Sequence, residues 1–327
     1  RRSAGGDVAG RSHSVGGWMA ALAIVCPGQG AQHPAMFALA LQSAAAAEWL
    51  DAYSAAAGID VVALARNGHG ADLFSNRNGQ LLVCAAAVAN WVALSTMVPQ
   101  PMLFAGYSAG EMAAYGCAGA WTAQTLAHIV SQRAACMDAA APADGGLMAV
   151  KGLRRDEVAV LCDEHALAEA IVVADDHVII GGRRGDLVAA AHALERRSVW
   201  HQLLDVAVPS HTPLMRDAVV PFRAAVLASS LQLPAVPVLA GIDGMPTMTV
   251  DAIADTLAAQ LAQPVDWLAC MQSTAERGAR IVLEVGAGKN LAKMFAECEE
   301  IDGIDSRSCD DFRSLEGVAA WINARCE

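Results

Sequence analysis

The sequence has little charge and few aromatic side chains, and it lacks several patterns that mark common functional classes. Only 17% of its 327 residues are charged and 5% are aromatic, whereas 55% are hydrophobic. Lys and Arg number 22 against 34 Asp and Glu, which gives a formal net charge of −12. Binding to nucleic acid needs a basic surface, and no basic stripe is present, so no nucleic-acid partner is expected.

The cysteines form no recognisable site. There are nine, an odd number, with no C-x-x-C spacing and no paired histidines at ligand distance. This predicts neither a disulfide framework nor a metal site, and it favours a reducing cytoplasm. The longest apolar run, residues 81–94, is too short to cross a bilayer and contains Asn90. We expect a cytoplasmic globular protein with no metal and no membrane contact.

The first 18 residues, RRSAGGDVAGRSHSVGGW, are rich in Gly, Ser and Arg. Arginines ahead of an apolar run resemble a signal peptide. This run, however, passes into Pro27-Gly28 without an A-x-A cleavage pattern. We therefore predict that residues 1–18 are a disordered leader and that the fold begins near Met19.

Apolar runs alternate with helical patterns through much of the chain. Strands are expected at 21–26, 102–106, 236–240 and 280–285, and helices at 34–57, 78–97, 109–117, 122–140, 213–229, 251–262 and 266–278. Such alternation predicts a parallel sheet covered on both faces. The predicted fold class is α/β, with a large α/β-hydrolase-like domain formed by residues 19–144 and 209–327.

The segment 145–208 has a different texture. Its pattern predicts a strand at 146–153, a helix at 154–165, a strand pair at 170–182, a helix at 186–197 and a strand at 200–210. The order β-α-β-β-α-β is that of a ferredoxin-like unit. We predict a small ferredoxin-like domain inserted into the larger one.

Ser108 lies in Gly106-Tyr107-Ser108-Ala109-Gly110, directly after an apolar run and before an alanine-rich segment. In a strand-turn-helix G-x-S-x-G, the glycines allow a sharp turn that lifts the serine hydroxyl to a helix N-terminus, where amides can hold an oxyanion. Close packing of a strand on a helix is the other interpretation of the same pattern. The motif alone leaves both open.

A serine nucleophile needs a base, and several histidines lie further along the chain. Those at 128, 165, 177, 192 and 201 lie in predicted helices, the hairpin or a strand, where an ordinary structural histidine is expected. His211, in AVPSHTPLM, comes after a predicted strand end, where α/β proteins place their chemistry. His211 is therefore the best candidate base.

Two glycine-rich loops fail the nucleotide-binding motifs. The loop Gly28–His33 lacks the third glycine of the dinucleotide fingerprint, and Gly286–Asn290 lacks the spacing and the Ser or Thr of a P-loop. Both loops come after apolar strands, so we expect them on the same rim of the sheet as Ser108.

Six segments together resemble the successive motifs of malonyl-CoA:acyl-carrier-protein transacylases, in that family's order. They are CPGQGAQ (26–32), AGYSAGE (105–111), SQRAACM (131–137), PSHTPLM (209–215), AAQLAQPVDW (258–267) and LEVGAGKNL (283–291). The resemblance extends from about residue 21 to 295. Ordered motifs over this length are far more specific than G-x-S-x-G alone.

The resemblance implies a role for each matching residue. Ser108 would carry the malonyl group as an ester, and His211 would act as base and then as acid toward the leaving thiol. Gln260 matches the family glutamine whose oxygen orients that histidine. The backbone amides of Gln29 and Ala109 would form the oxyanion hole.

The resemblance also implies how the acyl group is recognised. Arg133 would hold the free malonyl carboxylate, for which a planar guanidinium fork is well suited. Tyr107 stands where the family commonly has histidine, and Ser210 stands where fatty-acid members have phenylalanine. Both are expected to contact substrate, and the smaller Ser210 makes strict malonyl selectivity an open question.

GYSAGE, PSHTPLM and GIDG (241–244) together resemble the epsilon subunit of malonate decarboxylase. The resulting hypothesis is a transacylase that takes coenzyme A thioester as substrate, binds no cofactor, and acts with a carrier protein bearing a phosphopantetheine-type arm and other decarboxylase subunits. The alternatives are a fatty-acid or polyketide synthase transacylase, an acyl-CoA thioesterase or serine hydrolase, and a non-catalytic docking subunit.

Overall fold

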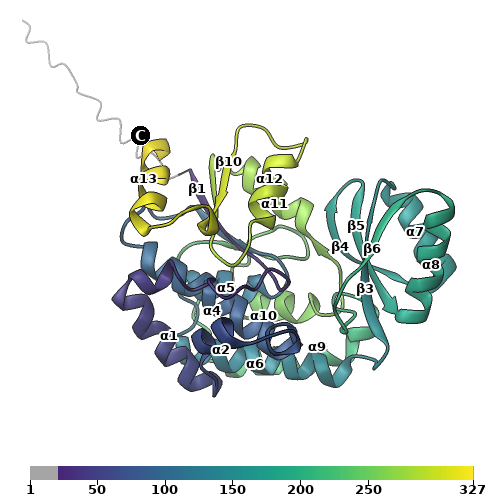
Figure 1. Ribbon diagram of the computed structural model, residues 1–327, viewed down its shortest axis with the longest axis horizontal. Coiled ribbons are helices and arrows are strands. Elements are labelled where there is room, and N and C mark those ends of the chain that lie inside the picture. The colour runs from purple at the N-terminus through teal and green to yellow at the C-terminus, as the bar shows by residue number, and fades with distance from the viewer. Residues whose placement is uncertain (1–20, 327) are drawn as a thin grey trace, which may run out of the picture.

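The computed structural model describes residues 21–326, so the expected leader at 1–18 lies outside the described residues. The chain forms an α/β structure with two five-stranded sheets, which we call sheet A and sheet B. Figure 1 shows sheet A surrounded by helices, with sheet B and two further helices to one side.

Sheet A is the parallel sheet expected from the alternating pattern. Its order is β10 (Asp305–Ser308), β9 (Ile281–Glu284), β1 (Leu22–Cys26), β2 (Leu103–Gly106) and β7 (Val238–Leu239). Every neighbouring pair is parallel. The carboxyl ends of the strands therefore meet at one edge, where the loops after β1, β2 and β9 come together.

Apolar side chains on both faces of sheet A explain why β1 is a continuous hydrophobic run. Leu22, Ile24 and Cys26 face one buried cluster and Ala23 and Val25 face another. The first cluster includes residues of α1 (Ala44–Ala57), α4 (Asn76–Leu94), α5 (Gly110–Cys117), α6 (Ala123–Ala140), α9 (Arg216–Ala228), α10 (Val250–Ala259) and α13 (Leu315–Cys326). The second includes residues of α11 (Trp267–Glu276) and α12 (Asn290–Glu297). A strand buried on both faces has an unbroken apolar sequence.

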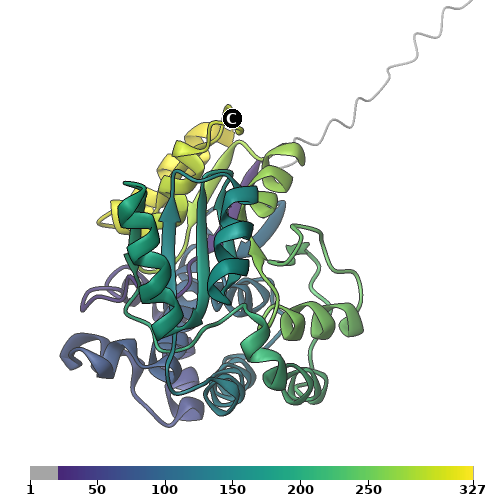
Figure 2. The ribbon, with the colours of Figure 1, turned by 90° about the vertical axis from the view of Figure 1, so that its right-hand side faces the viewer.

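Sheet B contains the segment expected to be ferredoxin-like. The elements run β3 (Gly145–Lys151), α7 (Arg155–His165), β4 (Ala168–Ala174), β5 (His177–Arg183), α8 (Arg184–Arg196) and β6 (Trp200–Leu203). Their order in the sheet is β6-β3-β5-β4, antiparallel throughout, and β8 (Val265–Asp266) adds to β4 in parallel. Figure 2 shows α7 and α8 over the outer face of this sheet. The expected division into domains stays a prediction.

Several element boundaries differ from the sequence-based expectation. The helix expected at 34–57 is broken into turns, a 3₁₀ turn at Ala40–Gln42 and α1, because the Ser43 side chain caps a new helix by accepting from the Ala46 amide. The strand expected at 200–210 ends at Leu203. The sequence pattern also gave no indication of α2 (Val61–Asn67), α3 (Ala71–Phe74), β8, β10 and the 3₁₀ turns at Pro213–Met215 and Cys309–Asp311.

None of the helices between residues 21 and 326 combines the length and apolar composition needed to cross a membrane. Over the same range, no group of His, Cys, Asp or Glu side chains is placed to hold a metal ion.

Candidate active site

Ser108 occupies a sharp turn between β2 and α5. Its φ angle is 55°, a left-handed conformation that residues with a side chain seldom adopt. The flanking glycines permit the turn, because a Cβ at Gly106 would lie 2.2 Å from the Glu111 amide nitrogen and one at Gly110 would lie 2.1 Å from the Cys26 oxygen. The two glycines therefore have a steric function that the motif by itself only suggested.

The structure brings Ser108 and His211 together although they are 103 positions apart. Ser108 Oγ lies 2.7 Å from His211 Nε2. On the other side of the ring, His211 Nδ1 lies 2.6 Å from the backbone oxygen of Gln260. A carbonyl oxygen only accepts, so Nδ1 carries the proton and Nε2 is free to accept the proton of Ser108.

The environment of His211 keeps its imidazole neutral. The side chain is fully buried, and burial together with the positive charge of Arg133 lowers the pKa of His211 to about 3. The hydrogen bond to the Gln260 backbone opposes this shift. A neutral ring with an unprotonated Nε2 is the form that a general base requires.

The amides expected to form an oxyanion hole are available as donors. Within residues 21–326, the backbone N–H groups of Gln29 and Ala109 donate to no protein acceptor. Ala109 immediately precedes α5, so its amide belongs to a helix N-terminus, where unpaired donors favour a negative charge.

Gln260 contacts His211 through its backbone oxygen, whereas its side chain has other partners. The side-chain oxygen accepts from Arg133 Nη2 at 2.8 Å. The side-chain nitrogen donates to Glu111 Oε2 and to the backbone oxygen of Ser108, the latter at 3.3 Å. The sequence could not indicate which of the two Gln260 oxygens meets the histidine.

Arg133 is buried next to this network. Its side chain is 1% exposed, and it donates to the Gln80 side-chain oxygen at 2.7 Å, to Gln260 Oε1 and to Met137 Sδ at 3.3 Å. Burial lowers the pKa of Arg133 to about 10, so the guanidinium remains charged at neutral pH. No carboxylate in the described part of the chain forms an ion pair with it. A buried cation held only by neutral groups can accept an incoming anion.

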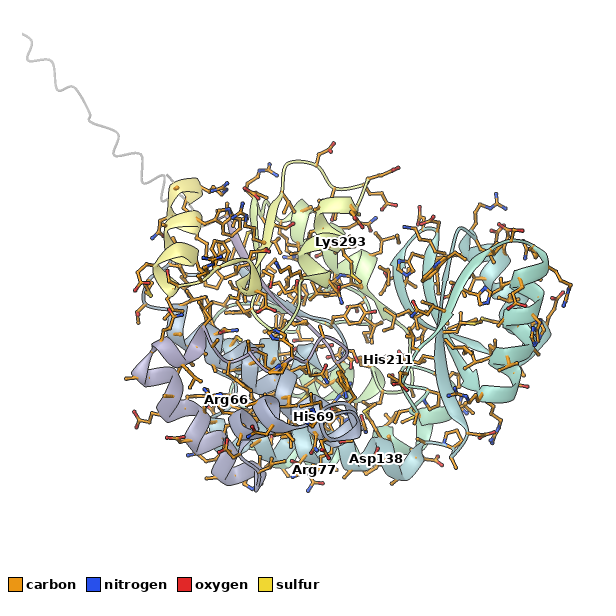
Figure 3. The ribbon with its side chains drawn as sticks, viewed as in Figure 1. Arg66, His69, Arg77, Asp138, His211 and Lys293 are labelled. Carbon is orange, nitrogen blue, oxygen red and sulfur yellow. The ribbon has the colours of Figure 1, made fainter. Side chains whose placement is uncertain are left out.

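Two hollows meet at Ser108. The first, about 260 Å³, is lined by both glycine-rich loops, by Tyr107, Ser108, Ser210 and His211, and by Leu147, Ile171 and Ile179 of sheet B. The second, about 440 Å³, is lined by Gln29, Ser108, Met137, Asp138 and Ser210 among others. In Figure 3 the labelled His211 lies between the parts of the molecule built on the two sheets. A thioester at Ser108 could therefore extend in two directions.

Tyr107 and Ser210 both line the first hollow, and their expected contact with substrate stays a prediction. The Tyr107 ring packs edge-on against Trp267 with centroids 5.6 Å apart. Arg133 and Ala109, in contrast, line neither hollow. Met137 lines the second hollow and also contacts Arg133, which links that hollow to the guanidinium.

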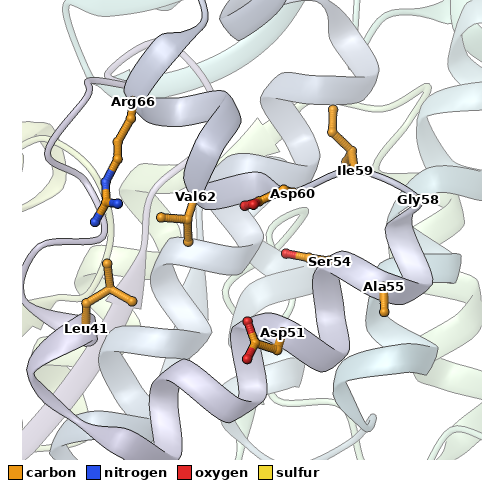
Figure 4. Close-up of a pocket in the computed structure, with 9 residues that line it drawn as sticks. All are labelled: Leu41, Asp51, Ser54, Ala55, Gly58, Ile59, Asp60, Val62 and Arg66. Carbon is orange, nitrogen blue, oxygen red and sulfur yellow. The ribbon is translucent and has the colours of Figure 1, made fainter.

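A larger hollow of about 550 Å³ lies between α1 and α2, away from Ser108 (Figure 4). Two of its polar side chains are already used by the fold, because Asp60 accepts from the Ala63 amide and Ser54 accepts from the Val61 amide. Its size alone does not indicate a function.

Two residues of the network were not identified from the sequence. Gln80 and Glu111 are fully buried, and each bonds to Arg133 or Gln260. The available signal was a polar residue within an otherwise apolar segment, for Gln80 at the start of a buried helix and for Glu111 within AGYSAGE. Such a signal marks a polar residue in the core but does not identify its partner.

Comparison with known proteins shows similarity along most of the chain. Residues 23–305 match the family described as acyl transferase domain. A malonyl CoA-acyl carrier protein transacylase of Salmonella typhimurium is 32% identical over 281 residues, which is 84% of this chain and 91% of the relative.

Solved structures agree with this similarity. The malonyl-CoA:acyl carrier protein transacylase of Xanthomonas oryzae superposes with a TM-score of 0.86 at 32% identity, over 93% of this chain and 98% of that one. A malonyl-transacylase solved in complex with a type II PKS acyl-carrier protein superposes with a TM-score of 0.86 at 26% identity, over 91% and 99%.

Proposed function

Because the chain belongs to the acyl transferase family and is an acyltransferase, we propose that it moves a malonyl group from coenzyme A to an acyl carrier protein. The acceptor is the thiol of a phosphopantetheine-type arm. The observation that carries the proposal is the 2.7 Å contact of Ser108 Oγ with an unprotonated His211 Nε2, beside a buried arginine that has no carboxylate partner among the described residues.

In the first half-reaction, His211 takes the proton of Ser108 as Oγ attacks the thioester carbonyl. The developing oxyanion would be stabilised by the amides of Gln29 and Ala109, and one such donor is typically worth about 3 kcal/mol in the transition state. The carbon–sulfur bond then breaks, and the coenzyme A thiol leaves with the proton from His211. The product is a malonyl ester on Ser108.

In the second half-reaction, the carrier thiol occupies the position that coenzyme A has left. His211 accepts its proton while the sulfur attacks the ester carbonyl, and Ser108 leaves and recovers the proton. The same base and the same oxyanion donors thus serve both steps, as expected for a covalent intermediate formed and discharged at one site.

Arg133 is proposed to bind the free carboxylate of the malonyl group. Support comes from its burial, its charge and its bonding to neutral groups alone. A carboxylate in the second hollow would reach it past Met137, which lines that hollow and contacts Arg133. An acetyl group has no carboxylate, so Arg133 would discriminate between the two acyl groups.

A fatty-acid or polyketide carrier is the better-supported acceptor. The relatives described above are named as acyl carrier protein transacylases, and one was solved with a type II PKS carrier. A malonate decarboxylase carrier is the second candidate, favoured by Tyr107, Ser210 and the GIDG segment. Transfer rates to purified carriers of the three kinds would decide between them.

The covalent step is tested by incubation with radioactive malonyl-CoA in the absence of carrier. Ser108→Ala is expected to abolish labelling of the protein, while Ser95→Ala, a serine at the end of α4, should label like the unmodified protein. Undiminished labelling of Ser108→Ala would refute the proposed nucleophile. Absence of label on the unmodified protein would favour a docking subunit.

A serine hydrolase would use the same dyad but pass the acyl group to water. Release of malonate from malonyl-CoA without carrier measures this reaction. Hydrolysis as fast as transfer would favour the hydrolase, whereas we expect transfer to be much faster.

A further inference from the structure

Glu111 is a buried carboxyl group that the proposed mechanism does not use. It lies on α5, one helical turn after Ser108, and its side chain is fully buried. Its Oε2 accepts from the Gly241 amide at 3.0 Å and from the Gln260 side-chain nitrogen. Within residues 21–326, its Oε1 has no partner. A buried carboxyl group is costly, so its place beside the dyad calls for an explanation.

Gln260 connects Glu111 to the proposed carboxylate ligand Arg133 and to the base His211. Its side-chain oxygen accepts from Arg133, and its backbone oxygen accepts from His211. Arginine only donates hydrogen bonds, and an ionised carboxylate only accepts them. Only one orientation of the Gln260 amide satisfies both neighbours, with its nitrogen toward Glu111 and its oxygen toward Arg133.

We propose that Glu111 is a positioning residue that fixes the Gln260 amide and thereby holds the Arg133 guanidinium ready for the acyl carboxylate. The proposal rests on the proposed function, because it takes the substrate carboxylate as the ligand of Arg133. Gln260 also separates the two charges. A direct bond between Glu111 and Arg133 would satisfy the cation with an internal carboxylate, and the substrate would have to displace it.

Orientation depends on an acceptor oxygen and not on a negative charge. Burial raises the pKa of Glu111 to about 7, against the lowering effects of the bonds from Gly241 and Gln260. The charges of Arg133 of α6 and Asp243 after β7 also affect the pKa of Glu111, in opposite directions. The charge of Glu111 in turn raises the pKa of Tyr115 on the same helix and of Cys270 on α11. When the carboxyl is protonated, the proton can reside on Oε1, and Oε2 still accepts from Gln260. A glutamine at this position would accept in the same way.

The readout is the ratio of kcat/KM for malonyl-CoA to kcat/KM for acetyl-CoA, measured in the full transfer reaction with a carrier protein. Glu111→Leu removes the nearer of the two acceptors of the Gln260 side-chain nitrogen and leaves it only the Ser108 backbone oxygen at 3.3 Å, so the ratio should fall about tenfold. Glu111→Gln keeps an acceptor oxygen, so its ratio should stay within about threefold of that of the unmodified enzyme. A change of about threefold corresponds to less than the typical contribution of one hydrogen bond. A general loss of stability would lower both rates and leave the ratio unchanged.

Two further variants complete the experiment. Gln260→Met breaks the same connection from the other end and should lower the ratio as Glu111→Leu does, which keeps the test decisive if Glu111→Leu fails to fold. Asn90→Leu removes a buried polar side chain of α4 that has no hydrogen-bond partner among the described residues and lines neither hollow at Ser108, so the ratio should not change.

Arg133→Ala separates the two proposals. If Arg133→Ala leaves the ratio unchanged, the carboxylate role of Arg133 is wrong and the positioning role falls with it. If Arg133→Ala lowers the ratio but neither Glu111→Leu nor Gln260→Met does, only the positioning role is refuted.

Discussion

Replacing Arg133 tests the recognition of the acyl group most directly. Its guanidinium is buried, remains charged, and bonds to the oxygens of Gln80 and Gln260 without a carboxylate partner among the described residues. A malonyl carboxylate bound by the planar fork would make two charge-assisted hydrogen bonds, each contributing roughly 1.5–3 kcal/mol. Arg133→Ala should therefore remove about 3–6 kcal/mol of transition-state stabilisation for malonyl transfer, which lowers kcat/KM by about 10²- to 10⁴-fold.

Acetyl transfer should respond differently to the same substitution. Acetyl-CoA offers Arg133 no carboxylate, so acetyl transfer should be slowed much less. The remaining loss would come from the hydrogen bonds that Arg133 donates to the side-chain oxygens of Gln80 and Gln260. Arg133→Lys retains a charge but not the fork, and it should give a malonyl-over-acetyl ratio between those of the unmodified enzyme and Arg133→Ala. The assay is steady-state transfer to a purified carrier with each thioester, together with a thermal melt of each variant.

Equal losses for malonyl and acetyl transfer would refute this reasoning. They would mean that Arg133 supports the structure around His211 and does not contact the acyl group. A matching drop in melting temperature would strengthen that conclusion.

Two further predictions concern the turn at Ser108 and the buried Glu284. Gly110→Ala places a Cβ 2.1 Å from the Cys26 oxygen, so this variant should lose activity and about 1–3 kcal/mol of its free energy of unfolding. Gly185→Ala is the control, because the space around Gly185 is open, and it should lose neither. A Gly110→Ala variant that is both active and stable would contradict the steric argument. Burial raises the pKa of Glu284 from 4.5 to about 8, so the folded state holds its proton more tightly and stability from this group falls as pH rises from about 4.5 to about 8. Denaturant unfolding measures the free energy of unfolding of Glu284→Gln minus that of the unmodified protein, and this difference should rise by up to about 4 kcal/mol from pH 5 to pH 8. A difference that does not depend on pH would refute the raised pKa of Glu284.

Much of the fold was predictable because its signals are local. The apolar run ending at Cys26 is short and is followed directly by Pro27-Gly28, a pattern typical of a strand buried on both faces. The strand β10 gave no such signal, because Asp305–Ser308 is polar and lies at the edge of sheet A. The two-residue strands β7 and β8 are too short for a periodic pattern to mark their boundaries.

The candidate site was predictable in its members more than in its contacts. Ser108 and His211 were singled out from the turn motif and from a strand end, and the resemblance added Gln29, Ala109, Arg133 and Gln260. The resemblance did not specify that the backbone oxygen of Gln260 meets His211 while its side chain faces Arg133 and Glu111. Those choices depend on how α5, α6 and the end of α10 pack together.

The sequence by itself determined the order of strand, turn and helix around Ser108, because an apolar run, Gly106 and Gly110, and an alanine-rich segment follow one another within a few residues. Only the tertiary structure decided that Ser108 meets His211 across 103 positions and that Arg133 is buried without a carboxylate partner in the described part of the chain. The physical reason is the range of the interactions. Backbone sterics act between neighbours in the chain, whereas hydrogen bonds and burial depend on groups that the packing of distant elements brings into contact.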